Sequence, residues 1–122
     1  ETDASIPLTV GEWEEWGNPN DARFFNYMLS YSPMNNILPQ DYPSILVTAG
    51  LHDPRVAYWE PMKWVAKLRE MKTDSNPLLL KVDLEAGHFS ASDRYKYLKE
   101  LSFDYAFLLD QLALKDSPIL KK

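Results

Sequence analysis

The sequence predicts an α/β fold built from a βαβ unit, in which two parallel strands are joined by a helix, with a further helix at the C-terminal end. Two short apolar runs, residues 44–49 and 78–83, are typical of strands buried on both faces. A helical pattern of apolar residues separates the two runs, and another follows the second run. Both strands require neighbours on each side, so we expect part of the sheet to be missing from this chain.

The first predicted helix lies between two segments that contain proline. Residues 18–21, Asn-Pro-Asn-Asp, offer a helix cap, and Pro33 closes the segment. Between them, apolar side chains recur at helical spacing: Phe24, Tyr27, Met28 and Tyr31. Residues 1–7 show neither a cap nor a periodicity, so we expect an irregular segment there.

The βαβ unit occupies the middle of the chain. Its first strand, residues 44–49, ends at Gly50, and Pro61 opens the crossover helix. The apolar face of that helix consists of Trp64, Val65, Leu68 and Met71. Residues 76–77, Asn-Pro, stop the helix before the second strand at 78–83. Three helices and two strands are therefore expected in total, the last helix being described next.

The C-terminal helix is predicted from a cap and a long apolar stripe. Ser90 and Asp93 have the spacing of a capping box. The apolar residues that follow lie on one face of the helix: Leu98, Leu101, Tyr105, Leu108 and Leu112.

Composition limits the function classes. The 122 residues allow one domain at most, with no boundary inside 1–122, and 13 Lys+Arg against 18 Asp+Glu give a net charge of −5. This acidity argues against nucleic-acid binding, which depends on neutralising phosphates. No cysteine is present, so disulfides, thiolate metal sites and thiol nucleophiles are excluded. No apolar run is long enough to cross a membrane and no signal pattern opens the chain, so we expect a cytoplasmic protein that does not bind membranes.

Chemistry-bearing residues follow each predicted strand. Asp53 comes after the first strand and His88 after the second, and the carboxyl ends of parallel strands are where catalytic groups gather. An Asp followed by a His in successive loops is the order of the last two members of an α/β-hydrolase triad. In such a triad the carboxylate holds the imidazole in the correct tautomer while the imidazole accepts the proton of the nucleophile. A loop-capping carboxylate and a surface imidazole explain the same spacing equally well.

Two other groups of residues allow more than one interpretation. His52, Asp53 and His88 supply three nitrogen or oxygen ligands, but the chain lacks a characteristic ligand spacing for zinc. Glu12, Glu14 and Glu15 are most simply solvated charges beside two tryptophans. If they converged on a pocket, paired carboxylates would bind a guanidinium group in a bidentate manner.

Several segments of the chain have distinctive sequences. The long stretches GEWEEWGNP at 11–19 and YWEPMKWVAKLR at 58–69 are the most specific. The others are residues 6–9, 31–33, 42–43, 50–53 and 86–88. Together these segments resemble the C-terminal end of the oligopeptidase B group in the prolyl oligopeptidase family of serine peptidases. The resemblance covers nearly the whole chain. It implies the C-terminal portion of an α/β-hydrolase catalytic domain, capped in the full enzyme by a β-propeller.

The resemblance also implies an activity and its residues. The family members that the chain resembles cleave short peptides after Arg or Lys without a cofactor. Asp53 and His88 match the triad Asp and His, and Arg55 matches an arginine that holds a substrate carbonyl. Glu12 and Glu14 match acidic residues associated with binding the basic side chain at the cleavage site.

The nucleophile is not in this chain. No Gly-x-Ser-x-Gly motif occurs, so the resemblance places the serine and the oxyanion hole upstream of Glu1. Ser90 is a poor substitute because it shares a loop with His88 and is expected to cap a helix. We therefore expect the chain alone to be inactive.

A function from a different class is compatible with the same sequence. The chain could be a non-catalytic module, derived from a hydrolase, that acts by pairing its exposed sheet edge with another protein. Under either interpretation such an edge can also pair with a second copy of the chain, which leaves a homo-oligomer open.

Overall fold

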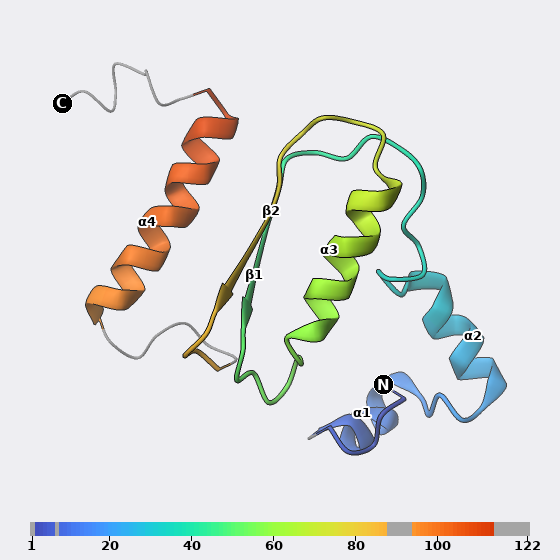
Figure 1. Ribbon diagram of the computed structural model, residues 1–122. Helices are drawn as coiled ribbons and strands as arrows, with labels where there is room; N and C mark the ends of the chain where they lie inside the picture. Colours follow the sequence, from blue (N-terminus) through green and yellow to red (C-terminus); the bar gives the residue numbers. More distant parts are fainter. Residues whose placement is uncertain (1, 7, 88–93, 114–122) are drawn as a thin grey trace.

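The computed structural model describes residues 2–6, 8–87 and 94–113, and it confirms the α/β class (Figure 1). Four helices and two strands occur within these ranges. In chain order they are α1 (Thr9–Trp16), α2 (Ala22–Tyr31), β1 (Ile45–Gly50), α3 (Trp59–Met71), β2 (Leu78–Asp83) and α4 (Arg94–Gln111).

The predicted βαβ unit is confirmed. β1 and β2 pair in parallel, and the register runs from Ile45 opposite Leu78 to Gly50 opposite Asp83. α3 packs against both strands. Figure 1 shows α3 on one side of the sheet and α4 on the other. All six residues of β1 pair with all six of β2, so the carboxyl ends of the two strands lie side by side. The loops that follow the strands are therefore neighbours as well.

The most deeply buried side chains lie on α3. Leu68 and Val65 are 0% and 1% exposed, and both belong to the apolar face that the sequence predicts for this helix. Met28 of α2 and Ile37, in the segment after it, are also buried. Burying a large aliphatic side chain contributes about 1.5–3 kcal/mol to the stability of the fold. The packing of α3 against β1 and β2 is therefore a main contribution to the stability of the βαβ unit.

The prediction of three helices is wrong because it omits α1. This helix begins after Leu8, whose φ of 75° lies in the left-handed region and whose side chain supplies no cap hydrogen bond. Gly11 lies inside the helix, where glycine is unfavourable. Neither a capping side chain nor a good helix-forming composition marked its start in the sequence.

The cap predicted at residues 18–21 is confirmed at Asp21, whose side chain accepts a hydrogen bond from the Arg23 backbone at 2.9 Å. The start of α3 differs from the prediction. α3 begins at Trp59, two residues before Pro61. A proline in the first turn is tolerated because the N–H that it lacks would have no partner within the helix.

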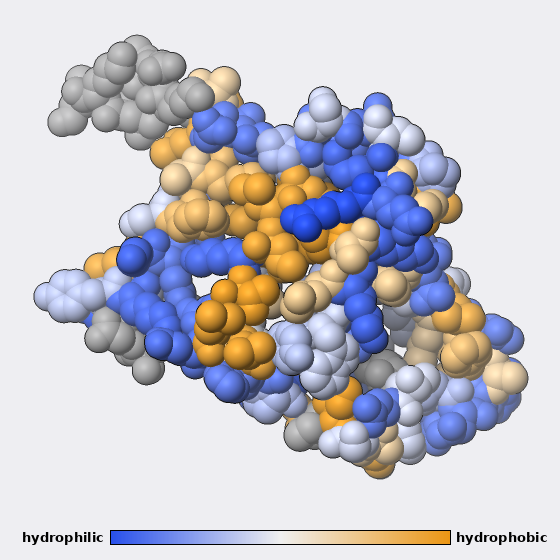
Figure 2. Space-filling model, in the orientation of Figure 1, coloured by the Kyte–Doolittle hydropathy of each residue, from blue (hydrophilic) through white to orange (hydrophobic). Residues whose placement is uncertain are grey.

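The predicted apolar stripe of α4 is only partly covered by the described residues. Leu98, Tyr105 and Leu108 are 44%, 57% and 49% exposed, and none of the residues in α4 is fully buried. Figure 2 shows apolar side chains at the surface over this part of the molecule. The predicted cap, Ser90 and Asp93, lies outside the described residues. None of the described helices combines the length and the apolar character that a membrane span requires.

An ion pair organises the end of the sheet at which the strands begin. Asp74 pairs with Lys72 and also accepts hydrogen bonds from the backbone N–H groups of Tyr42 and Asn76, both at 2.7 Å. The two charged side chains are only 12% (Lys72) and 8% (Asp74) exposed. The hydrogen bond from Lys72, followed by the one from Tyr42, lowers the pKa of Asp74 to about 2. The segments that enter β1 and β2 are thereby tied together.

Asp74→Asn in the full-length protein is expected to lower the melting temperature at pH 7. The folded pKa of Asp74 lies below its ordinary value of 3.8, so its charge stabilises the fold above about pH 4 and this contribution is lost as the pH falls to about 2. The difference in melting temperature between variant and wild type should therefore shrink across that range, as measured by thermal unfolding. Glu70→Gln, at an exposed carboxylate on α3, is the control. A difference that stays constant from pH 7 to pH 2 would contradict the charge assignment.

Candidate functional site

The loops that follow β1 and β2 are joined by main-chain hydrogen bonds. The Leu51 N–H donates to the Asp83 carbonyl at 2.8 Å, and the His52 N–H donates to the Ala86 carbonyl at 3.1 Å. These bonds extend the contact of the two strands beyond the end of the sheet. The loop that carries Asp53 is therefore in direct contact with the segment that leads into His88.

Gly50 makes this close approach possible. A Cβ atom at Gly50 would lie 2.3 Å from the Gly87 carbonyl oxygen and 2.6 Å from the Ala86 carbonyl oxygen. Both are backbone atoms, so neither could move away without displacing the loop. The last strand position of β1 therefore has to be a glycine for the two loops to meet.

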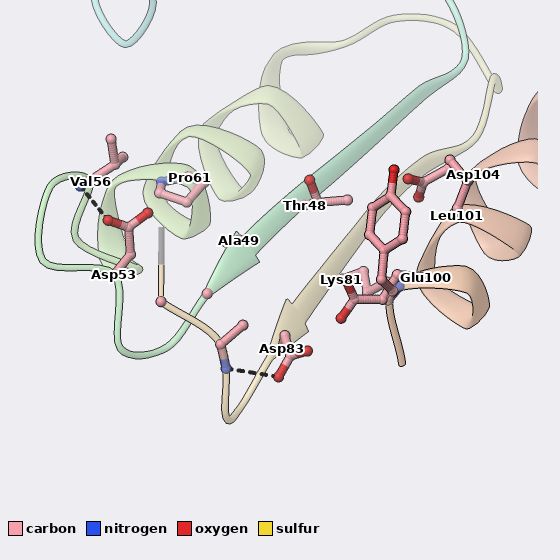
Figure 3. Close-up of a pocket in the computed structure, with 14 residues that line it drawn as sticks. Thr48, Ala49, Asp53, Val56, Pro61, Lys81, Asp83, Glu100, Leu101 and Asp104 are labelled. Carbon is pink, nitrogen blue, oxygen red and sulfur yellow. Dashed lines mark hydrogen bonds between the residues drawn. The ribbon is translucent and has the colours of Figure 1, made fainter. Parts of the chain in front are cut away.

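The Asp53 carboxylate is oriented by its own loop. Its Oδ1 atom accepts hydrogen bonds from the backbone N–H groups of Arg55 at 2.8 Å and Val56 at 2.9 Å. The Asp53 N–H donates to the Gly50 carbonyl at 3.3 Å. Figure 3 shows Asp53 on the loop after β1, at one end of a pocket. The half-buried carboxylate is thus held in place without any contribution from a substrate.

Of the other predicted residues in these loops, the structure describes Arg55 and His52 but not His88 or Ser90. Arg55 and His52 are exposed on the loop after β1. His88, the predicted base, and Ser90 lie outside the described residues, so the pairing of His88 with Asp53 stays a prediction. Among the described residues, no group of three His, Asp or Glu side chains could hold a metal ion. The alternative metal site formed with His52 includes His88 and stays untested for that reason.

Glu12, Glu14 and Glu15 all lie on α1. Glu12 is half-buried, whereas Glu14 and Glu15 are exposed. Residues two apart on a helix do not face each other, so Glu12 and Glu14 leave α1 in different directions. Figure 1 shows α1 at the end of the molecule toward which the strands point. The glutamates are therefore on the same end of the fold as the Asp53 loop.

A pocket of about 540 Å³ lies between the sheet, the two loops and α4 (Figure 3). Its lining includes four carboxylates: Asp53, Asp83, Glu100 and Asp104. Lys81 contributes a positive charge and contacts the ring of Phe103 on α4, with 4.7 Å between Nζ and the ring centre. Asp104 Oδ1 is buried and has no hydrogen-bond partner among the described residues. The pocket is therefore strongly acidic.

Asp83 organises the loop after β2 much as Asp53 organises the loop after β1. Its Oδ1 atom accepts hydrogen bonds from the N–H groups of Glu85 at 2.8 Å and Ala86 at 3.0 Å. Its Oδ2 atom pairs with the Lys96 ammonium of α4 at 3.2 Å. The Glu85 N–H, then a hydrogen bond with the Glu100 side chain and the Lys96 ammonium, hold the pKa of Asp83 well below its usual range.

Sequence reasoning did not single out this second carboxylate. Two signals could have identified it. Asp83 occupies the last position of a strand at the end where catalytic loops gather. Lys96, Glu100 and Asp104 are spaced four residues apart, which places them on one face of a helix.

Comparison with known proteins agrees with the geometry. The model of the prolyl oligopeptidase family matches residues 1–115. Oligopeptidase B from Leishmania major superimposes with a TM-score of 0.92 at 60% sequence identity, covering 97% of this chain and 16% of that one. Oligopeptidase B from Trypanosoma brucei, solved in a closed form with antipain covalently bound, gives 0.87 at 68% identity, covering 91% and 16%. Protease 2 from Moraxella lacunata is 51% identical over 93% of this chain and 16% of its own length.

The βαβ unit with α4 is thus the C-terminal portion of an α/β-hydrolase domain whose sheet is incomplete within the described residues. The chain belongs to the prolyl oligopeptidase family. The resemblance to oligopeptidase B that the sequence showed is confirmed. The chain spans about 16% of the length of these relatives.

Gly50→Ala in the full-length protein is expected to force the two loops apart and to destabilise the fold by about 1–3 kcal/mol, as overpacking commonly does. Thermal unfolding measures this loss. Gly11→Ala is the matched control, because a Cβ atom at Gly11 would meet no atom within 4 Å and alanine favours a helix. Equal stability of Gly50→Ala and wild type would contradict the close contact of the loops.

Proposed function

We propose that this chain is the part of a serine oligopeptidase that supplies the Asp and His of the catalytic triad, Asp53 and His88. The serine would lie upstream of Glu1, and the full protein would hydrolyse short peptides through an acyl-enzyme intermediate. The observation that supports this most strongly is the hydrogen-bonded contact between the two loops. It brings the loop that carries Asp53 into contact with Ala86, two residues before His88 in the sequence.

Each residue has a chemical role in this proposal. The Asp53 carboxylate would hold the imidazole of His88 in one tautomer and stabilise the imidazolium when it forms. His88 would accept the proton of the serine and then donate it to the leaving amine. A relative that is 68% identical was solved with antipain covalently bound. Covalent binding requires a nucleophile in that relative, which agrees with an acyl-enzyme route for this one.

We also propose a preference for Arg or Lys at the cleavage site. Glu12 and Glu14 would both attract the basic side chain; because they leave α1 in different directions, Glu12 would contact it directly and Glu14 would act through its charge. Arg55 would hold a backbone carbonyl of the substrate. α1 lies at the carboxyl end of the sheet, and the acidic pocket beside Asp53 would attract a cationic peptide. Glu12 is the more buried of the two carboxylates, so its charge would be screened less by solvent.

The remaining partners follow from the same proposal. The substrate-binding site would be completed by the N-terminal part of the catalytic domain and by a β-propeller, and the protein would be cytoplasmic. No cofactor is required by the triad chemistry. The open sheet edges suit either the rest of this domain or a separate partner protein. Because the chain spans about 16% of its relatives, the rest of the domain accounts for the edges without a second protein.

Asp53→Asn or His88→Ala in the full-length protein should collapse turnover of an arginyl substrate, by about 10⁴-fold for the Asp variant. Steady-state kinetics measure turnover, and circular dichroism shows whether the fold is retained. His52→Ala, on the same loop, is the matched control and should remain near normal. Near-normal rates for Asp53→Asn would refute the triad. Loss of activity in His52→Ala together with inhibition by a chelator would favour the metal site instead.

The double variant Glu12→Gln with Glu14→Gln should lower kcat/KM for an arginyl substrate about 10- to 100-fold more than for a neutral one, which is typical of losing a charged hydrogen bond. We expect Glu12→Gln alone to account for most of the loss, because Glu12 is the less exposed carboxylate. Glu15→Gln is the control for a general change of charge on α1. Equal losses on both substrates would reject the assignment of the basic-residue pocket.

A further inference from the structure

Asp83 contacts three parts of the fold through its carboxylate and its main-chain carbonyl. Through Oδ1 it fixes the backbone of Glu85 and Ala86, and through its ion pair with Lys96 it is tied to α4. Lys96 also contacts the Glu85 carboxylate, with 3.1 Å between Nζ and Oε2. The main-chain carbonyl of Asp83 accepts the hydrogen bond from Leu51 at the start of the other loop. One residue therefore connects the loop after β2 with both the loop after β1 and α4.

These contacts control where the chain stands immediately before His88. Ala86, whose N–H is held by Asp83, uses its carbonyl to accept the hydrogen bond from His52. His52 adjoins Asp53, and Gly87 follows Ala86. Two hydrogen bonds thus connect the Asp83 carboxylate, through Ala86, to the backbone N–H of His52.

Of the two ion pairs that Lys96 makes, the one with Asp83 is the less exposed to solvent. Asp83 is 18% exposed and Lys96 is 36% exposed, whereas Glu85 is 84% exposed. Exposed ion pairs contribute little because solvent screens them, so the Lys96–Glu85 contact should be minor. The Asp83 carboxylate, by contrast, accepts two backbone hydrogen bonds and is paired with an ammonium group.

We propose that the Asp83–Lys96 ion pair positions the loop that leads to His88, and that it thereby sets the rate of peptide hydrolysis without touching the substrate. The inference rests on the proposed function, since it assumes that His88 is the base. Misplacing a catalytic group by about 1 Å can cost about 100-fold in rate. Asp83 and Lys96 are positioning residues: they affect the reaction only by holding the backbone of residues 84–87 in place.

The test uses Lys96→Met and Asp83→Asn in the full-length protein. Lys96→Met keeps the apolar stem of the side chain and removes the ammonium group, so we expect kcat for an arginyl substrate to fall about 10- to 100-fold with KM nearly unchanged. Lys96→Arg, which keeps the charge, should restore most of kcat. Asp83→Asn, which retains one oxygen as an acceptor, should lower kcat in the same direction.

The matched control is Lys72→Met. Lys72→Met breaks the Lys72–Asp74 ion pair, which is more buried than the Asp83–Lys96 pair and lies near the opposite end of β2. A purely structural effect would lower the melting temperature in both variants and leave kcat similar in both. The positioning role requires kcat to fall in Lys96→Met while Lys72→Met retains it. Equal kcat values in the two variants, or a fall in kcat that Lys96→Arg fails to restore, would overturn the proposal.

Hydrogen exchange separates this proposal from the function on which it rests. We expect peptides covering residues 84–87 to exchange faster in Lys96→Met than in wild type, and no such change in Lys72→Met. If the wild type fails to hydrolyse arginyl peptides, the proposed function fails, and exchange alone then decides whether the ion pair holds the loop. Unchanged exchange in Lys96→Met would overturn the positioning role even if the wild type is active.

Discussion

The close contact of two loops at the carboxyl end of the sheet is the constraint on which the rest of the described structure depends. The contact requires the two strands to be paired so that Gly50 lies opposite Asp83. It also requires a glycine at position 50, because a Cβ atom there would clash with the backbone of the other loop. α3 packs against both strands and carries the two most deeply buried side chains, Val65 and Leu68. The sheet and its crossover helix thus act together to fix the separation of two loops, and Asp53 is held on one of them.

Asp53 and Asp83 solve the same physical problem at the ends of neighbouring strands. Each carboxylate accepts hydrogen bonds from backbone N–H groups two and three residues further on, which makes a tight turn out of a segment that has no secondary structure. Their surroundings then separate their roles. Asp83 is neutralised by Lys96 of α4 and serves the architecture. Asp53 lines the same pocket and, under the proposed function, is the carboxylate that orients the imidazole of His88.

The sequence predicts those parts of the fold that are encoded locally. Both strands and α3 were identified from apolar runs and helical spacing, and Asp53 from its place after a strand. α1 was missed because a left-handed Leu8 and an internal glycine give no local signal of a helix. With α1 unrecognised, the spacing of Glu12 and Glu14 could not show that the two side chains diverge. Asp83 was missed because its role depends on Lys96, which only the folded chain brings to it.

α4 carries apolar groups that are exposed and, at the pocket, a buried polar atom without a partner. Leu98 and Leu108 of α4 are 44% and 49% exposed, and the buried Oδ1 of Asp104, which lines the pocket, has no hydrogen-bond partner among the described residues. A buried acceptor without a donor costs about 1–3 kcal/mol, and exposed leucines forgo the gain of burial. A chain segment that covered this face with apolar groups and one donor would remove both costs. Because this chain is about 16% of the length of its relatives, the structure that completes the sheet can complete the pocket as well. Under the proposed function, the same contacts would then serve both folding and catalysis.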